Sequence, residues 1–481
     1  MRPFQWIGAG LGIAILIVFL LLPPLAPLTS LGMRTVGVFL CTICFWVAVD
    51  TGFSSFLCIG LIALTGVLTP NDAFAASLGS WLPLFLIACF GLSEALRLTG
   101  FSRRFAFWFL TRPFAKGHPW LLLCLFFLGV TVLGAILSAT VTTILFLTIG
   151  LAFVEGMGYQ KGDRFAAMLI MGIGWAATCS FVMTPVGHGN NLVCMDWVLR
   201  DTGFKISFPS WMIVGIPLGL ITYLMLMLYF RFVIRPDMKQ FTAMVDNYIT
   251  KEASQLKPMQ AAEKIAAGTF GAVFVIWMLP SFLGGILPGI SSYLDKLGVV
   301  VPPLVGAIIL CMIRINKKPL MSFHQWMAGI EWGTVALVAA IMILGAVIAK
   351  PETGILELMS IFIKPLVSGS PFFVVVLVSV LWVVLQANVM SHLVSATVVY
   401  TIMMPVVIAA AVGNPAALGF TIFAASNPAF ALPSATTSTA IVIGSGWVPV
   451  KFMVRYGVVL IIPIILIYAF LCYPLANLIF R

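Results

Sequence analysis

The sequence predicts an all-α polytopic membrane protein made of two inverted repeats, each with a re-entrant hairpin and a discontinuous helix. Of its 481 residues, 62% are hydrophobic and 9% are charged, whereas about 25% of the residues of a soluble domain are charged. Apolar stretches near the roughly 20 residues that cross a bilayer recur from Trp6 to Phe480. The same order of features also occurs twice along the chain. A soluble fold is therefore excluded, and lipid surrounds nearly the whole chain.

The chain is expected to divide into four segments. The first apolar stretch, Trp6 to Leu22, is followed by Pro23 and Pro24 rather than by a small-residue cleavage site, so we expect an uncleaved helix here. A basic, polar stretch in the middle of the chain could lie on the membrane surface, partly as an amphipathic helix. The expected segments are a first transmembrane helix in 1–33, a first inverted repeat in 34–230, a cytoplasmic linker in 231–265 and a second inverted repeat in 266–481.

Basic residues in the short loops predict the orientation of the chain. With Arg2 on the cytoplasmic side, most of the 26 lysines and arginines fall in cytoplasmic loops, as the positive-inside rule requires. We therefore expect a multi-pass protein of the inner (plasma) membrane with its N-terminus in the cytoplasm and its C-terminus outside. The net charge of +11 then reports this topology and indicates no nucleic-acid partner.

This orientation requires two long apolar runs, Pro119 to Val154 and Pro371 to Val412, to enter and leave the membrane on the same side. About 35 residues suit two short helical arms with a turn at the small polar residues in the middle. Each run is therefore predicted to be a hairpin. Two ordinary spans joined by a tight external turn are the alternative.

Corresponding features in the two halves favour the hairpins. The first half has Trp81, then Ser138-Ala139-Thr140, then a broken helix at Thr184-Pro185-Val186-Gly187. The second half has Trp332, then Ser395-Ala396-Thr397, then a broken helix at Pro433-Ser434-Ala435-Thr436. Five crossings in each half reverse its direction, so the repeats are expected to be inverted. Paired, interrupted segments of this kind are typical of secondary transporters, whose site lies between the repeats at the bilayer midplane.

Hydroxyl groups at the hairpin tips and helix breaks are the candidate substrate ligands. Helix ends freed at a break favour an anion, and hydroxyls hold carboxylate or sulfate oxygens without burying a full positive charge. Freed carbonyls beside them could bind a monovalent cation. The alternative is that these side chains only allow close packing or bond to their own helix. The candidates are Ser138, Thr140, Ser395, Thr397, Thr436 and Thr437, with Ser438 beside them.

Titratable residues give a second set of candidates. His188 directly follows the first break, and His392 lies three residues before Ser395. His188 either caps a helix end or binds an anion when protonated, and both readings stay open. Glu331, like the other acidic residues near span ends, is assigned to the membrane surface, so a carboxylate proton relay has little support.

The hairpins and breaks resemble those of the divalent anion:sodium symporter family, which carries dicarboxylates, citrate and sulfate. The resemblance spans nearly the whole chain. It is closest in Trp81 to Arg104, Leu137 to Ala152, Gly187 to Leu192, Leu393 to Pro405 and Phe430 to Gly446. It implies that Ser138, Thr140, Ser395, Thr397, Asn191 and Thr436 contact the substrate, and that Ser138, Gly187, Ser391, Ser395 and Ala435 lie at sodium sites. It also implies a homodimer in which the site-bearing domain moves like an elevator.

The sequence departs from the family pattern at the residues that would bind sodium. Ala139 and Ala396 replace the asparagines of the family's Ser-Asn-Thr motifs, and Gly134 stands where a serine is expected near the first cation site. The Thr-Pro-Pro-Asn runs of the family's breaks are also mostly replaced. Coupling by sodium and coupling by protons, for which His188 is the candidate, both remain open.

The sequence thus predicts a secondary active transporter of small organic or inorganic anions, of the di- or tricarboxylate or sulfate class. An uncoupled facilitator, an exchanger or a channel of the same fold is the alternative. No H-E-x-x-H motif and no paired membrane aspartates occur, so an enzyme is not expected. The expected partners are a small anionic substrate, the lipid bilayer and a second copy of the chain, with no cofactor other than sodium as a coupling ion.

Overall fold

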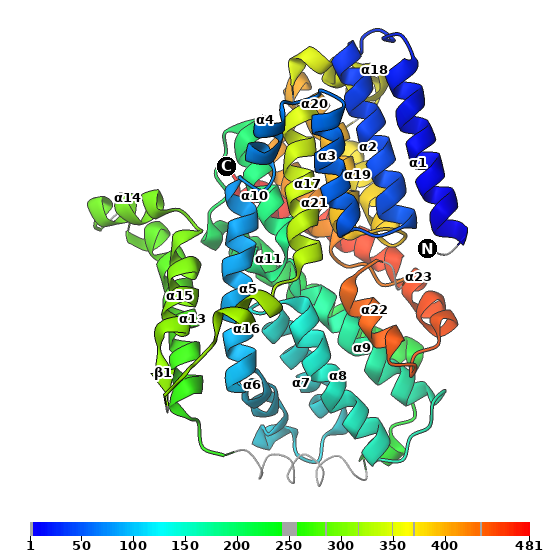
Figure 1. Cartoon of the computed structure of the whole chain (residues 1–481). Helices are drawn as coiled ribbons and strands as arrows, with labels where there is room; N and C mark the ends of the chain where they lie inside the picture. Colours follow the sequence, from blue (N-terminus) through cyan, green and yellow to red (C-terminus); the bar gives the residue numbers. More distant parts are fainter. Residues whose placement is uncertain are drawn as a thin grey trace.

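The computed structural model describes residues 3–242, 257–283, 286–315, 317–348, 350–368, 371–432 and 435–481. Within these ranges the chain is almost entirely helical, and its strands are the short antiparallel pair β1 (Arg314–Ile315) and β2 (Lys318–Pro319). Seven helices of this described part are long and apolar enough to cross a membrane. The expectation of an all-α, multi-pass membrane protein is confirmed (Figure 1).

The first half of the chain begins with a helix that packs against α2. Its α-helices are α1 (Pro3–Leu21), α2 (Ser30–Ala48), α3 (Phe53–Leu64), α4 (Pro70–Ala76), α5 (Trp81–Thr99), α6 (Phe101–Leu110), α7 (Pro119–Gly134), α8 (Ala139–Gly156), α9 (Arg164–Ser180), α10 (Gly189–Thr202) and α11 (Phe208–Tyr229). Short 3₁₀ turns η1 (Pro113–Ala115) and η2 (Pro185–Gly187) and the π-helix η3 (Phe230–Ile234) complete it.

The second half carries a corresponding series of elements. Its α-helices are α13 (Ala261–Leu283), α14 (Pro288–Leu297), α15 (Val301–Met312), α16 (Phe323–Ala328), α17 (Trp332–Ile348), α18 (Ile355–Ser368), α19 (Phe372–Ala387), α20 (His392–Ala410), α21 (Pro415–Ser426), α22 (Thr437–Gly444), α23 (Val450–Ile467) and α24 (Tyr473–Ile479). The 3₁₀ turn η4 (Pro351–Thr353) precedes α18, and the π-helix η5 (Tyr468–Cys472) joins α23 to α24.

Both long apolar runs form helical hairpins. α7 and α8 are joined by a turn at residues 135–138, and α19 and α20 by a turn at residues 388–391. In Figure 1 the first hairpin lies in the lower half of the view and the second lies in the upper half. Each run therefore consists of two helices joined by a short turn, and the re-entrant course of the hairpins through the membrane stays a prediction.

Both expected helix breaks are also present. α9 ends at Ser180 and α10 begins at Gly189, and the chain between them is irregular apart from η2. α21 ends at Ser426 and α22 begins at Thr437. Pro433 and Ser434, the first two residues of the predicted second break, lie outside the described residues. The two breaks free helix ends in the interior, where partners for the backbone groups must come from the protein.

The helices that precede the breaks form the centre of the molecule. Every residue of α9 from Phe165 to Ser180 is buried, and so is every residue of α21 from Ala416 to Ser426. By contrast, α13 and α23 expose many apolar side chains, including Val275, Phe282 and Ile462. An apolar exterior around a densely packed interior is expected for a protein whose surroundings are lipid.

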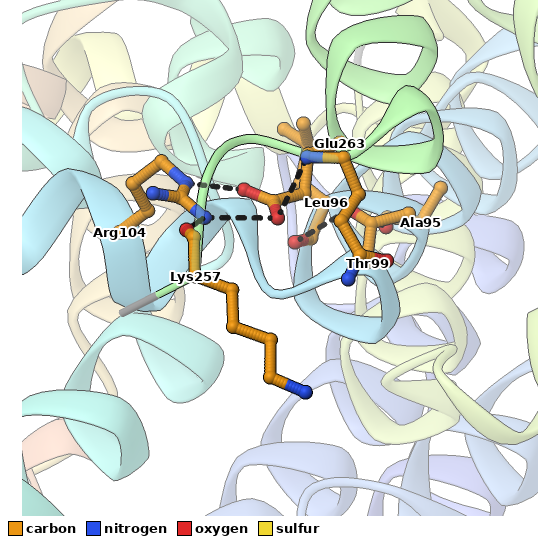
Figure 2. A network of polar contacts seen from close by, with 7 residues as sticks. Ala95, Leu96, Thr99, Arg104, Lys257 and Glu263 are labelled. Atoms are coloured by element: carbon orange, nitrogen blue, oxygen red, sulfur yellow. Dashed lines mark hydrogen bonds and ion pairs between the residues drawn. The ribbon is translucent and has the colours of Figure 1, made fainter. Parts of the chain in front are cut away.

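A sharp corner links the first half to the start of the second. α5 is capped by Gly100, whose φ of +86° suits glycine, and α6 begins at the next residue. Arg104 of α6 pairs with both carboxylate oxygens of Glu263 in the first turn of α13, with 3.1 Å between Nη2 and Oε1, and donates to the carbonyl of Lys257 at 2.7 Å (Figure 2). Thr99 bonds back to the carbonyl of Ala95 at 2.9 Å. The corner is therefore tied to the beginning of the second half.

The helices extend into the segment that the sequence assigned to the linker. η3 continues α11 to Ile234, and α13 begins at Ala261, inside the predicted linker of residues 231–265. Residues 243–256, which form the middle of the predicted linker, lie outside the described residues, and an amphipathic helix in the linker stays a prediction. The segment boundaries thus stay a prediction.

Candidate functional site

Three helix N-termini converge on one interior cavity. It is lined by Ser138, Ala139 and Thr140 at the start of α8, by Gly187, His188 and Gly189 at the start of α10, and by Thr437 and Ser438 at the start of α22. The cavity has a volume of about 70 Å³. The N-terminus of a helix presents unpaired N–H groups and a partial positive charge. The cavity is therefore suited to an anion.

Five of the predicted site residues meet there. Ser138, Thr140, Gly187, His188 and Thr437 come from the first hairpin and from both breaks, and all line the cavity. Ser138 is the N-cap residue of α8 and is half-buried at the cavity wall. The two breaks lie far apart in the sequence, and the fold brings their residues to one place.

His188 acts as a helix cap and also reaches across to the second half. Its Nδ1 atom accepts the backbone N–H of Asn190 at 3.1 Å, and its Nε2 atom lies 2.9 Å from Nε2 of His392. The ring of Phe181 stacks on His188 with 4.8 Å between the ring centroids. The capping role that the sequence left open for His188 is confirmed. His392, which contacts His188, also lines the cavity.

Behind this pair, a cluster of buried amides joins the two broken helices. Asn190 donates to Ser426 Oγ at 2.8 Å and to Asn427 Oδ1 at 3.2 Å, and Asn427 donates to Asn191 Oδ1 at 3.4 Å. Asn191 also donates to the carbonyls of residues 181 and 184. All four side chains are fully buried. The bonds hold the break of the first half against the break of the second half.

Several predicted ligands do not line the cavity. Ser395 donates to the carbonyl of Ser391 at 3.0 Å and Thr397 to that of Leu393 at 2.8 Å, so both hydroxyls bond within their own helix. Thr436 forms a capping box with Thr439. The polar side chain of Asn191 is used in the amide cluster. The side chains of these four residues make hydrogen bonds within the protein, and none of the four lines the cavity.

The predicted sodium ligands are likewise divided. Ser138 and Gly187 line the cavity, whereas the Ser391 carbonyl and the Ser395 hydroxyl bond to each other. The carbonyl of Ala435 contacts His392 Nδ1 at 3.0 Å. The predicted sodium ligands of the second half are therefore already used in internal hydrogen bonds, whereas those of the first half, Ser138 and Gly187, lie at the cavity wall. Binding of sodium stays a prediction.

Glu331 is a cavity residue that sequence reasoning missed. It was assigned to the membrane surface, but its carboxylate lines the cavity, where Oε1 accepts the hydroxyl of Ser138 and Oε2 accepts that of Thr334 at 3.2 Å. Glu331 immediately precedes α17, a helix that packs against α2, α3 and α5. In the sequence, an acidic residue next to an apolar span is usually assigned to the membrane surface. Only the tertiary fold brings Ser138, at the tip of the first hairpin, to Glu331.

Comparison with known proteins shows similarity to transporters along the whole chain. A family model described as a citrate transporter matches residues 5–433. The sodium-dependent dicarboxylate transporter SdcS of Staphylococcus saprophyticus is 25% identical over 98% of this chain and 92% of its own length. SdcS of Staphylococcus aureus strain USA300 is 26% identical over 95% and 89%. The YdaH transporter of Alcanivorax borkumensis has a similar fold, with a TM-score of 0.55 at 12% identity over 97% of this chain and 98% of that chain.

Proposed function

Because the chain belongs to the citrate transporter family, which matches residues 5–433, we propose that it is a secondary active transporter of di- or tricarboxylates. The membership confirms the resemblance to divalent anion:sodium symporters, and the family and its relatives are transporters rather than enzymes. The observation that carries the proposed substrate class is the convergence of the N-termini of α8, α10 and α22 on one cavity. A carboxylate placed there would accept N–H and hydroxyl donors from both halves of the chain.

The cavity can bind an anion although no lysine or arginine among the described residues that line it supplies a positive charge there. Hydroxyls of Ser138, Thr140 and Thr437 and the backbone amides beside them are then the donors to a carboxylate. Binding that relies on dipoles and hydroxyls allows release on the other side of the membrane, because no full ion pair must be broken. Sulfate carries similar acceptor oxygens and is the other candidate substrate that the sequence predicts.

Transport is proposed to be driven by a cation gradient. Two relatives are named sodium-dependent, which supports sodium as the coupling ion. The replacement of both motif asparagines by Ala139 and Ala396 supports protons instead. An uncoupled facilitator or an exchanger of the same fold remains the second candidate function, and the same replacements favour it.

The site is proposed to move as one body. His188 with His392, Asn190 with Ser426, and Thr143 with Ser438 at 2.9 Å join residues of the first half to residues of the second. A motion that separated the two halves of the site would break all of these bonds, which are buried or partly buried, each at a cost of about 1 kcal/mol. An elevator-like displacement of the whole site keeps them. We propose this motion, together with a homodimer, a cytoplasmic N-terminus and an external C-terminus.

Uptake into proteoliposomes tests the proposal. The purified protein is reconstituted, and uptake of radiolabelled citrate, succinate or sulfate is followed under an inward sodium gradient, an inward proton gradient, or neither. A coupled transporter accumulates its substrate above the external concentration under one of the gradients only. Equilibration without accumulation identifies a facilitator, and uptake that requires internal substrate identifies an exchanger. Failure of all three anions to enter contradicts the proposed substrate class.

A further inference from the structure

Glu331 places a carboxylate inside a cavity that favours carboxylates. It is the one acidic residue among the described residues that line the cavity, and it is half-buried there. Its Oε1 atom accepts the hydroxyl of Ser138, which lies 193 positions away in the sequence at the tip of the first hairpin. Its Oε2 atom accepts the hydroxyl of Thr334. Oε2 therefore bonds to a residue in the first turn of α17, and Oε1 bonds to a residue of the proposed substrate site.

Part of this arrangement is ordinary helix chemistry. An acidic side chain at the start of a helix is stabilised by the partial positive charge there, and the contact with Thr334 fits that role. The contact with Ser138 does not, because Ser138 belongs to another element. Helix capping therefore accounts for the presence of an acid before α17 but not for its bond to the hairpin tip.

We propose that Glu331 is an internal competitor for the substrate, whose carboxylate occupies the Ser138 hydroxyl and holds the first hairpin against the start of α17. This inference rests on the proposed function, in which Ser138 binds a substrate carboxylate. Two carboxylates cannot both accept the single hydroxyl hydrogen of Ser138, and their like charges repel at close range. A substrate that binds Ser138 must displace Glu331, and the hairpin tip is then released from α17.

The contact is confined to one of the two hairpins. Trp81 and Trp332 begin the corresponding helices α5 and α17, so the position that corresponds to Glu331 in the first half is Ser80. Ser80 offers a buried hydroxyl instead of a carboxylate, and Ser395 of the second hairpin bonds within its own helix. Competition and release therefore concern the first hairpin only.

The consequence is that substrate binding itself frees one hairpin. A competitor that occupies the site nine-tenths of the time weakens the apparent affinity about tenfold, because only the remaining fraction is competent to bind. Removing the competitor should therefore strengthen binding, whereas removing an ordinary substrate ligand weakens it. The direction of the change in substrate affinity therefore tests the inference.

Citrate binding to the purified, detergent-solubilised protein provides the first test. Glu331→Ala is expected to bind citrate roughly tenfold more tightly than the wild type. Glu331→Gln is expected to fall between them, because its amide oxygen still accepts the Ser138 hydroxyl without the charge. The matched control is Asp72→Ala, which removes an acid that accepts the Thr69 hydroxyl at 2.7 Å at the start of α4, outside the cavity. Unchanged or weaker binding in Glu331→Ala overturns the competition.

Hydrogen exchange of the substrate-free protein provides the second test. Glu331→Ala is expected to speed amide exchange in residues 136–143 about tenfold and to leave residues 388–395 unchanged, and Asp72→Ala should change neither segment. Equal exchange of residues 136–143 in the wild type and Glu331→Ala overturns the hold on the hairpin. If the wild type binds none of citrate, succinate and sulfate, the proposed substrate class and the competition are both contradicted, whereas the exchange result still decides whether Glu331 holds the hairpin.

Discussion

His188 and His392 share a single N–H across the two halves of the chain, with 2.9 Å between their Nε2 atoms. The carbonyl of Ala435 can only accept, so Nδ1 of His392 carries a proton, and Nδ1 of His188 accepts the N–H of Asn190. His188 therefore carries its proton on Nε2 and donates it to Nε2 of His392. These partners assign both tautomers, and every ring nitrogen of the pair has one partner.

The histidine pair should behave as one unit in a double-mutant cycle. We expect His188→Ala and His392→Ala each to lower the midpoint of thermal unfolding, because each leaves the Nε2 atom of the other ring without its partner. The double variant should be about 1 kcal/mol more stable than the sum of the single effects predicts. His324→Ala, on the exposed surface of α16, is the control. Strictly additive effects would show that the 2.9 Å contact contributes nothing.

Threonine-to-valine substitutions separate the two hairpins. Thr140 lines the cavity, whereas the Thr397 hydroxyl donates to the carbonyl of Leu393. Thr140→Val keeps the shape of the side chain and removes a hydroxyl donor, so substrate affinity should fall by about 1 to 3 kcal/mol. Thr397→Val should leave affinity unchanged if the arrangement in the structure is the one that binds. If both threonines bind the substrate, as the sequence predicts, both variants bind less tightly, and equilibrium binding of citrate decides between the two expectations.

The fold could be predicted from the sequence because its signals are local. Proline and glycine beside small polar residues mark the breaks at Thr184 and Thr436, and the length of the run from Pro119 leaves room for two short helices. The same hairpin and break patterns recur in the second half of the chain, so the prediction in one half supports the prediction in the other. The start of α13 at Ala261 was not predicted, because this helix begins in polar sequence.

The site was predicted only in part, because its remaining features depend on tertiary contacts. A threonine in a helix can bond to the carbonyl four residues earlier or to a ligand, and the sequence around Thr397 is compatible with both. Glu331 enters the cavity only because the first hairpin reaches the start of α17. Nothing local to Glu331 distinguishes it from an acid at the membrane surface.

Asn190 is expected to be a stabilising residue rather than a substrate ligand. Asn190→Ala leaves the Ser426 hydroxyl and the Asn427 carbonyl oxygen without their donor in a fully buried cluster. Loss of these bonds should destabilise the protein by about 2 kcal/mol. Thermal unfolding in detergent measures this, with the exposed Asn71→Ala as the control. Citrate affinity of the folded fraction should change little, and a large change in affinity with normal stability would instead place Asn190 in the binding site.

Gly134 explains why the expected serine of the first cation site is absent. Gly134 ends α7, and a Cβ atom placed on it would lie 2.5 Å from Oγ of Ser180, the last residue of α9. The Ser180 hydroxyl donates to the carbonyl of Ala177 at 2.6 Å in a fully buried position. The space that a serine at position 134 needs is therefore already filled by the side chain of Ser180.

Restoring the serine should consequently require a second change. Gly134→Ser alone is expected to destabilise the protein by about 1 to 3 kcal/mol through overpacking. Gly134→Ser combined with Ser180→Gly removes the conflicting atoms and should recover most of that loss in thermal unfolding. If the serine then supplies an oxygen to the first sodium site, citrate uptake by the double variant in proteoliposomes should depend more strongly on sodium than uptake by the wild type, with Ser180→Gly alone as the control. A double variant that is stable but whose sodium dependence equals that of the wild type would show that Gly134 does not lie at a cation site.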